Sequence, residues 1–323
     1  MNWRPDASWS MLQQRADLFK SVRQFFENRG VTEVDTHLLS QYGVTDVHLK
    51  NLSTEFSQPL PSGTNTLYLQ TSPEFAMKRL VAAYQQDIYQ LSHVVRDDEV
   101  GRYHNPEFTL LEWYRIGFDD NALINEVSQL LSETCGAPPI VERSYQQCFL
   151  ETLKLDPLTP DGIEGIRQHL ESVPALTDWM QKETDASTIL QVAFSECIEP
   201  TFTKNVPQCV TRFPVEQAAL ARVDESDPRV AKRFEVYYQG VELANGYHEL
   251  TDAVEQTRRF QDDNRHRVTN KQPQMAADKR LISALESGLP DCAGVALGFD
   301  RLLMIKSGAK HISEVLPFTT NNA

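Results

Sequence analysis

The segment of residues 96–114, RDDEVGRYHNPEFTLLEWY, constrains this chain more than any other, because it indicates two apolar strands joined by a polar loop. In an extended second strand the side chains alternate, which puts Phe108, Leu110, Glu112 and Tyr114 on one face, with Arg96 nearby. A guanidinium group suits a phosphate, an aromatic ring suits a nucleobase, and a carboxylate suits an ammonium group. The hairpin therefore predicts a floor for ATP and an amine-bearing substrate. The alternative is an ordinary hairpin with a salt bridge.

Composition and charge narrow the class of protein. The 323 residues are 41% hydrophobic, enough for one large core or a core with an insertion. The chain has 31 Lys and Arg against 45 Asp and Glu, and its net charge of −14 disfavours a polyanion such as tRNA. The five cysteines are widely spaced, with no CxxC pair to suggest zinc or a disulfide framework. Neither a signal peptide nor a membrane-spanning apolar run is evident, so we expect a soluble cytoplasmic protein.

Hydrophobic periodicity predicts an α+β fold with a mainly antiparallel sheet flanked by helices, because strands outnumber units in which a helix joins parallel strands. Residues 144–200 change to helical segments broken by prolines, and we interpret them as a helical insertion in a single domain of residues 1–323. The predicted helices cover residues 10–28, 72–83, 123–131, 251–267 and 299–305. The predicted strands cover residues 31–34, 68–70, 87–96, 108–115, 208–213, 234–238, 241–250 and 295–297.

A second predicted hairpin carries three equally spaced acids, Glu235, Glu242 and Glu249. A two-residue turn places Glu242 opposite Tyr237, on the same face as Glu235. Two neighbouring carboxylates repel each other unless a cation joins them, and Mg²⁺ bound to phosphates is a natural solution. Glu249 reaches that face only through a bulge, which we predict at the Asn-Gly pair of residues 245–246. The alternative is a solvated acidic face.

Two further segments have structural explanations when taken alone. Ser72, Pro73 and Glu74 are typical of a helix start, with serine as the cap, proline in the first helical position and an early acid. In residues 294–302, GVALGFDRL, small residues let a ligand approach the strand backbone. There Arg301 would lie in the first turn of a helix beyond Gly298, where its guanidinium can pair with a phosphate or cover a base.

Taken together, these segments resemble the class II aminoacyl-tRNA synthetases, and in particular their lysyl branch. Residues 30–36 resemble motif 1, residues 96–114 motif 2 and residues 294–302 motif 3, while residues 72–74 and 242–249 resemble lysine-binding elements. The runs RYHNPEFT, RFEVYY, ELANG, HELTDA and PDCAGVALG are similar to the elongation factor P–(R)-β-lysine ligases. That subfamily activates β-lysine with ATP and transfers it to a lysine side chain of elongation factor P. Because the first predicted helix begins at residue 10, we expect no N-terminal anticodon-binding domain.

The resemblance implies a role for each matching residue. Arg96 and Arg301 would be catalytic, acting on the α-phosphate, and Glu235 and Glu242 would hold Mg²⁺. The implied ATP-binding residues are Arg96, Asp97, Asp98, Asn105, Phe108, Glu242, Leu243, Gly298 and Arg301. The implied substrate-binding residues are Ser72, Pro73, Glu74, Glu112, Tyr114, Asn245, Glu249 and Ala296.

Three positions bear on how closely the chain follows the family. His37 stands where motif 1 normally has proline, which bears on dimer geometry, and Asp98 is one methylene shorter than the expected glutamate. Ala296 agrees with the ligases, because true lysyl synthetases tend to have glycine there. The implied function is transfer of (R)-β-lysine to elongation factor P by a homodimer that uses ATP and Mg²⁺, without tRNA or membrane. Two alternatives stay open: an adenylate-forming enzyme with another acceptor, and a non-catalytic regulatory paralogue.

Overall fold

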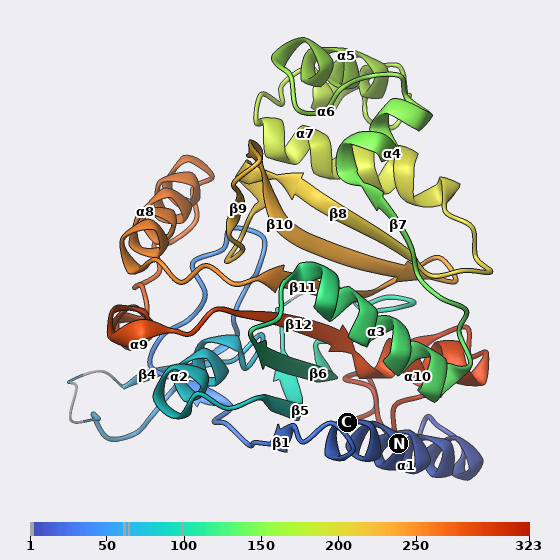
Figure 1. Cartoon of the computed structure of the whole chain (residues 1–323), viewed down its shortest axis with the longest axis vertical. Coiled ribbons are helices and arrows are strands. Elements are labelled where there is room, and N and C mark those ends of the chain that lie inside the picture. Colours follow the sequence, from blue (N-terminus) through green and yellow to red (C-terminus); the bar gives the residue numbers. More distant parts are fainter. Residues whose placement is uncertain (1–2, 61–62, 64, 98–99) are drawn as a thin grey trace.

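The centre of the fold is a mainly antiparallel sheet (Figure 1). The computed structural model describes residues 3–60, 63, 65–97 and 100–323. Among the described strands, the order is β1-β5-β6-β12-β11-β10-β8-β7 with β9 beside β10, and the β1–β5 and β7–β8 pairs are parallel. The strands are β1 (Thr32–Glu33), β5 (Ile88–Val95), β6 (Glu107–Ile116), β7 (Val141–Ser144), β8 (Gln208–Pro214), β9 (Val223–Asp224), β10 (Asp227–Tyr238), β11 (Val241–His248) and β12 (Cys292–Gly298). A smaller sheet is formed by β2 (Leu39–Ser40), β4 (Thr66–Leu69) and β3 (Ser53–Glu55).

One face of the large sheet is covered by α1 (Trp9–Glu27), α3 (Asp120–Cys135) and α10 (Phe299–Ser307). Their apolar stripes bury side chains such as Phe26 and Leu303 against Trp113 of β6 and Val295 of β12. Each of the two longer helices begins at a side-chain cap, Ser8 for α1 and Asp119 for α3, which satisfies a free backbone N–H of the first turn. This face is therefore closed and forms the main core.

The opposite face is covered only at its two ends. At one end, α2 (Glu74–Tyr84), α8 (Ala253–Thr269) and α9 (Lys279–Gly288) pack their apolar side chains against Tyr114 and Cys292. At the other end, the helices between residues 145 and 201 pack against Phe213 and Tyr237. In the order of the chain these helices are α4 (Tyr145–Thr152), α5 (Pro160–Glu171), α6 (Thr177–Met180), α7 (Ala186–Ala193), η1 (Phe194–Ile198) and η2 (Glu199–Thr201). The middle of this face is left open to a ligand.

The two predicted hairpins are confirmed. β5 pairs with β6, and Leu110, Glu112 and Tyr114 share one face as expected. In the β10–β11 hairpin, Gln239 and Gly240 both have positive φ, the conformation of a tight two-residue turn with the twist of the strands. The helical character of residues 144–200 is also present. Whether it is an insertion in a single catalytic domain stays a prediction.

Several local predictions are wrong in position. The bulge of β11 is at Leu243, not at residues 245–246: Val236 pairs with Ala244 and Tyr237 pairs with Glu242, which leaves Leu243 as the extra residue. From Ala244 to His248 the pairing with β12 is unbroken. Pro73 is the residue before α2 rather than its first helical residue. Residues 279–288, for which we predicted no element, form α9, because their apolar side chains find α2 and α8 as partners only in the folded chain.

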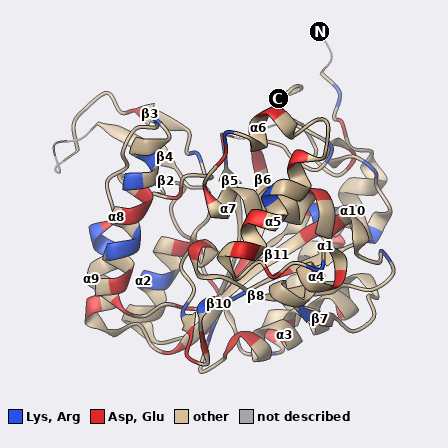
Figure 2. Ribbon diagram, turned by 90° about the horizontal axis from the view of Figure 1, so that it is seen from above, with Lys and Arg blue, Asp and Glu red and all other residues tan. Residues whose placement is uncertain are grey.

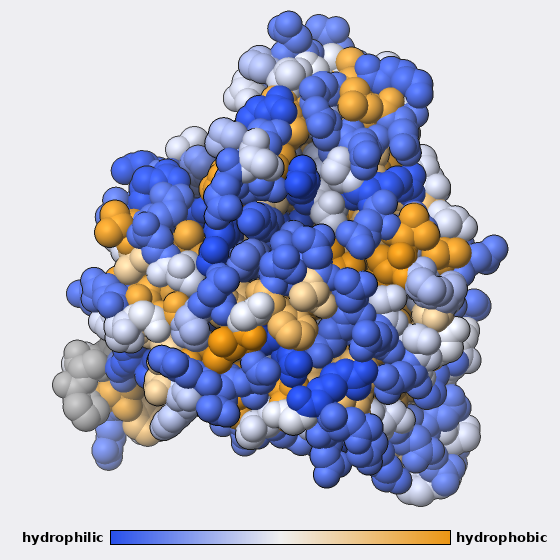
Figure 3. Space-filling model, in the orientation of Figure 1, coloured by the Kyte–Doolittle hydropathy of each residue, from blue (hydrophilic) through white to orange (hydrophobic). Residues whose placement is uncertain are grey.

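Charge is spread over the surface rather than gathered into one basic face (Figure 2). The arginines of α8 are largely matched by acids of the same helix: Arg258 pairs with Glu255 and Asp262, and Arg265 pairs with Asp262. The face in Figure 3 is mostly hydrophilic, with small separate apolar areas. No helix in the described ranges combines the length and apolar character needed to cross a bilayer.

Candidate active site

The open part of the sheet forms the floor of a cavity of about 1470 Å³. Its central strand is β12, which turns only small residues, Gly294, Ala296 and Gly298, toward the cavity. A Cβ atom at Gly294 would lie 2.4 Å from the ring of Tyr114 and 2.5 Å from Oε1 of Glu249. A side chain at this position would therefore collide with both groups, and glycine lets them close over the strand.

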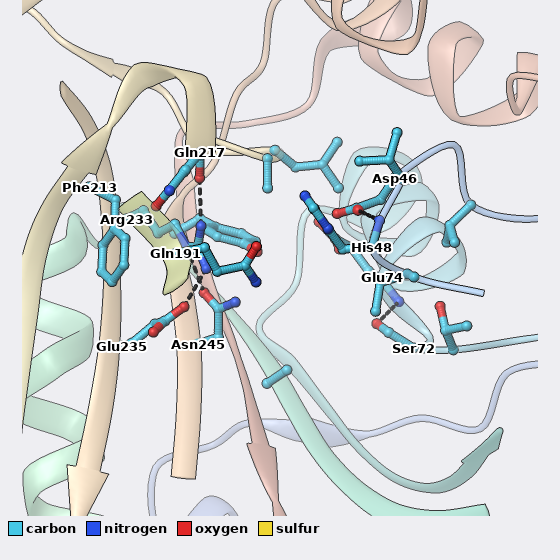
Figure 4. A pocket seen from close by; sticks show the side chains of 18 of the residues that line it. Asp46, His48, Ser72, Glu74, Gln191, Phe213, Gln217, Arg233, Glu235 and Asn245 are labelled. Atoms are coloured by element: carbon cyan, nitrogen blue, oxygen red, sulfur yellow. Dashed lines mark hydrogen bonds and ion pairs between the residues drawn. The ribbon is translucent and has the colours of Figure 1, made fainter. Parts of the chain in front are cut away.

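The two neighbouring strands supply the functional side chains. Phe108, Leu110, Glu112 and Tyr114 line the cavity from β6, in agreement with the sequence prediction. The bulge at Leu243 changes the alternation of β11, so that Glu242, Asn245 and Glu249 all line the cavity. The predicted consequence of a bulge is thus correct, although its location is not. Figure 4 shows Ser72 and Glu74 on one side of the cavity and Arg233, Glu235 and Asn245 on the other.

One end of the cavity, which we call the acidic end, is formed by Glu74, Glu112, Tyr114 and Glu249. Ser72 Oγ donates a hydrogen bond of 2.7 Å to Glu112, and the hydroxyl of Tyr114 donates one of 2.8 Å to the other carboxylate oxygen. Burial, reinforced by the charge of Glu74, raises the pKa of Glu112 to about 7 against the effect of these hydrogen bonds. Burial likewise raises the pKa of Glu249 to about 8. The raised pKa values mean that these carboxyls take up protons near neutral pH more readily than an exposed glutamate, and a cationic ligand would favour their ionised forms.

Lys78 contacts the carboxylates of the acidic end but does not itself line the cavity. The sequence prediction missed it as a site residue. Its Nζ lies 2.7 Å from Oε1 of Glu74 and 2.5 Å from Oε2 of Glu249, and only 2% of its side chain is exposed. Burial alone would lower the pKa of Lys78, but the charges of Glu249 and Glu74 outweigh burial and raise it. The available signal was the spacing of Glu74 and Lys78, because residues four apart meet on one helix face.

The other end of the cavity, the arginine end, contains Arg96, Phe108, Glu242 and Arg301. The guanidinium of Arg301 donates hydrogen bonds to the backbone oxygens of Glu242 at 2.9 Å and Tyr103 at 3.3 Å. The guanidinium of Arg96 lies 5.1 Å from the centre of the Phe108 ring, and its Nε donates to the oxygen of Thr71 at 3.3 Å. Two guanidinium groups and an aromatic ring are therefore placed together, as predicted for a nucleotide site.

Two of the acids, Glu235 and Glu242, differ in the partners they already have. Glu235 is buried and accepts hydrogen bonds from Arg233 and from the hydroxyl of Tyr237. The carboxylate of Glu242 is 42% exposed and lies 3.6 Å from Arg301. No group of three or more His, Cys, Asp or Glu side chains among the described residues is arranged to hold a metal ion by itself. A cation here would depend on phosphate oxygens and water for its other ligands.

Three of the described predicted residues do not present free side chains to the cavity. Asp97 pairs with Lys50 at 2.7 Å and lies outside the cavity lining, as does Pro73. Asn105 lines the cavity, but its amide nitrogen donates to the backbone oxygen of Glu107 and its amide oxygen accepts from Thr320. An adenine edge at Asn105 would therefore have to meet the backbone. Asp98 lies outside the described residues.

Glu199 is a cavity-lining acid that the sequence prediction missed. Burial, together with the charges of Glu242 and Glu235, raises its pKa to about 7. It belongs to the helices of residues 145–201, whose sequence gave no indication of function because none of their motifs indicates a ligand. Only the folded chain brings Glu199 to the arginine end.

The geometry agrees with the comparisons to known proteins. Residues 1–322 match the family described as class II tRNA synthetases (D, K and N). The chain is 48% identical to the elongation factor P–(R)-β-lysine ligase of Pasteurella multocida, over 100% of this chain and 98% of the relative. It is 47% identical to the ligases of the same name from Hamiltonella defensa, with the same coverage, and from Salmonella typhi, over 99% of this chain and 98% of the relative. The chain belongs to the class II tRNA synthetase family and, within it, to the elongation factor P–(R)-β-lysine ligases.

Proposed function

We propose that this enzyme activates (R)-β-lysine with ATP and transfers the β-lysyl group to the ε-amino group of a lysine on elongation factor P. The observation that carries the proposal is the single cavity with an acidic end for ammonium groups and an arginine end for phosphates. Phe108 and Tyr114 are six residues apart on β6, at about 3.3 Å for each residue. This length suits a diamine and ATP that lie end to end between the acidic end and the arginine end. The names of the full-length relatives support the same reaction.

The first step takes place at the arginine end. A carboxylate oxygen of β-lysine attacks the α-phosphorus of ATP, the bond to the β-phosphate oxygen breaks, and pyrophosphate leaves. Arg96 and Arg301 offset the negative charge that develops on the phosphoryl oxygens. The ring of Phe108 supports the adenine face, and Arg301 lies over the other side of the nucleotide. Gly298 keeps the end of β12 free of a side chain.

The acidic end positions the substrate for that attack. Glu74 takes the substrate amine nearer the carboxylate, and Tyr114 and Glu249 take the distal amine. Glu112 accepts hydrogen bonds from Ser72 and Tyr114 and provides a third carboxylate to receive the amines, while Asn245 and Ala296 line the wall between the two ends. These contacts fix the carbon chain so that its carboxylate faces the arginine end.

In the second step the neutral ε-amine of the acceptor lysine attacks the carbonyl carbon of the adenylate. The new amide bond forms as the bond to the phosphate oxygen breaks, and AMP leaves. The attacking amine must lose a proton, because its ordinary pKa is about 10.4. A phosphate oxygen of the departing AMP or a cavity carboxylate accepts this proton.

Mg²⁺ fits the arginine end through Glu242, whose carboxylate is partly exposed beside Arg301. Mg²⁺ in nucleotide sites is usually held by one or two carboxylates together with phosphates and water, so Glu242 and Glu235 are the residues that would hold it. Glu235 would first have to exchange its hydrogen bonds with Arg233 and Tyr237. When bound, the ion supplies charge stabilisation to the phosphates. We also propose a homodimer in the cytoplasm, for which sedimentation at several concentrations is the direct measurement.

The decisive experiment is ATP–pyrophosphate exchange with (R)-β-lysine and α-lysine, followed by mass spectrometry of elongation factor P. We expect exchange to require one of these diamines, and elongation factor P to gain the mass of one β-lysyl group. Purified tRNA serves as the alternative acceptor. Lysylation of tRNA in place of elongation factor P would contradict the proposed acceptor. An absence of exchange with both isomers would favour a non-catalytic role.

A further inference from the structure

Lys78 is a charged residue at a depth where a charge needs partners. It lies in the second turn of α2 and is 1% exposed. It contacts two carboxylates that are far from each other in the sequence. Glu74 belongs to the same helix, whereas Glu249 follows β11. A buried ammonium group without acids nearby would lose its charge, so this contact geometry keeps Lys78 cationic.

Lys78 stands behind the acidic end rather than inside it. Glu74, Glu112 and Glu249 line the cavity, whereas Lys78 does not. Glu249 is itself fully buried, and its Oε1 has no hydrogen-bond partner among the described residues. That oxygen lies beside Gly294 on the cavity floor. The lysine thus occupies one side of the carboxylate pair and leaves acceptor oxygens for a ligand on the other.

The charges at the acidic end correspond to those of a diamine. Glu74, Glu112 and Glu249 provide three negative charges when ionised, and Lys78 compensates one of them. Two negative charges remain, which equals the two ammonium groups of lysine or β-lysine. Without Lys78, the site would have one buried carboxylate more than a diamine can neutralise.

We infer that Lys78 is a positioning residue that sets the charge of the acidic end at minus two and thereby matches it to a substrate with two ammonium groups. The inference rests on the proposed function, because it takes Glu74, Glu112 and Glu249 as the groups that receive the amines. Lys78 itself does not touch the substrate. It acts through the two carboxylates that it holds.

The surroundings of Lys78 support this role. The titratable groups around Lys78 and its partners include Glu112 and Tyr114 of β6, Tyr247 of β11 and Cys292 of β12. Arg222 also lies near, because its guanidinium donates to the backbone oxygen of Glu249 at 3.5 Å. The helix α9, which packs against α2, contributes the apolar Leu281 and Leu285. Lys78 is thus the cation that pairs with both carboxylates, and its removal leaves the side chains of Glu74 and Glu249 without the ion pair that they share.

The test uses three variants of the full chain: Lys78→Met, Glu249→Gln and the double variant Lys78→Met/Glu249→Gln. Pyrophosphate exchange gives separate KM values for the diamine and for ATP between pH 6 and 9, with thermal unfolding measured alongside. We expect Lys78→Met to raise the KM for the diamine about 100-fold at pH 7, with the KM for ATP nearly unchanged. Its diamine KM should improve at higher pH than in the wild type, because the uncompensated acids retain their protons longer.

The double variant distinguishes an effect of charge from a purely structural role of Lys78. It also provides a test if Lys78→Met alone fails to fold. Glu249→Gln alone leaves the acidic end at minus one, and adding Lys78→Met returns it to minus two. We therefore expect the double variant to bind the diamine about tenfold better than Glu249→Gln. A double variant no better than the single Glu249→Gln variant would overturn the inference, because a purely structural lysine predicts further loss.

Lys20→Met is the matched control, because Lys20 lies on the surface of α1 with 78% of its side chain exposed. It should behave as the wild type in every measurement. If the wild type itself shows no exchange with either lysine isomer, the proposed function fails. If the wild type is active and Lys78→Met keeps the diamine KM and its pH profile, only the inference fails.

Discussion

The two ends of the cavity are built differently. At the acidic end the charged groups are buried and hold one another: the side chains of Lys78 and Glu249 are 2% and 1% exposed. At the arginine end, Arg301 is 20% and Glu242 42% exposed, and Arg301 donates mainly to backbone oxygens. The folded chain thus fixes the amine receptors before the substrate arrives, whereas the phosphate receptors can exchange their present partners for a ligand. We expect changes at the acidic end to act on substrate KM, and changes at the arginine end to act on turnover.

The largest effect expected from this difference is that of Arg301→Ala. Removing a guanidinium group that offsets transition-state charge should lower kcat for pyrophosphate exchange about 1000-fold. The KM for the diamine should change little, because Arg301 contacts Glu242 and Tyr103 of the arginine end rather than the amine receptors. Steady-state exchange kinetics with each substrate varied in turn measures both quantities.

A matched control for Arg301→Ala is Arg265→Ala. Arg265 is an exposed residue of α8 that pairs with Asp262 of the same helix and lies outside the cavity lining. Its kinetics should equal those of the wild type. An equal loss of diamine affinity in Arg301→Ala would show that the two ends do not act separately.

Among the residues that line the cavity, the next largest effect is expected at Glu112. Glu112→Gln keeps the shape of the side chain and removes its charge. One of the hydroxyls of Ser72 and Tyr114 can still donate to the amide oxygen, while the other must accept from the amide nitrogen. Loss of a charged partner for a buried ammonium group should raise the KM for the diamine about 30-fold and leave the KM for ATP unchanged. The same exchange assay measures this. A fall in kcat with unchanged diamine KM would contradict the assignment of Glu112 to substrate binding.

The pH dependence should also differ between the ends. A dication binds ionised carboxylates, and the pKa values of Glu112 and Glu249 are raised to about 7 and about 8, so these carboxyls gain protons as the pH falls below 8. Binding must release those protons, and the KM for the diamine should fall at least about tenfold from pH 6 to 8. The arginines of the arginine end do not titrate in this range, so any slope that this end adds to the KM for ATP comes from Glu199, whose pKa is raised to about 7.

Stability offers an independent measure of the same protons. Between the ordinary pKa of a glutamate and about pH 8, the folded state holds protons that the unfolded chain has released. The contribution of these groups to the free energy of unfolding therefore falls as the pH rises in that window. The rise in melting temperature on adding the diamine should become larger as the pH increases from 6 to 8. A diamine KM that is flat from pH 6 to 8 would contradict both expectations.

Sequence reasoning found the parts of the site that depend on local alternation. Strand β6 puts Glu112 and Tyr114 on one face by its period alone, and the turn at Gln239 and Gly240 fixes Glu242 opposite Tyr237. The position of the bulge was missed, because the Asn-Gly signal at residues 245–246 competes with an unbroken pairing to β12 that no local pattern reveals. Lys78 and Glu199 were missed for a related reason: the spacing of Glu74 and Lys78 was a local signal, but Glu249 and the partners of Glu199 come from distant segments. The family and the fold class are confirmed, whereas the site roles stay predictions.

The smallest effect concerns Ala296, which lies between the two ends. It pairs with Glu112 on one side and Asn245 on the other, and its methyl group is on the cavity face of β12. Ala296→Gly should shift the ratio of kcat/KM for (R)-β-lysine over α-lysine toward α-lysine by about tenfold, because one methyl group in a binding site is worth about 1–3 kcal/mol. Ala293→Gly is the control on the same strand, since Ala293 is buried in the main core on the other face. It should lower stability and leave the ratio unchanged. If both variants shift the ratio equally, flexibility of β12 rather than the methyl group decides which isomer is accepted.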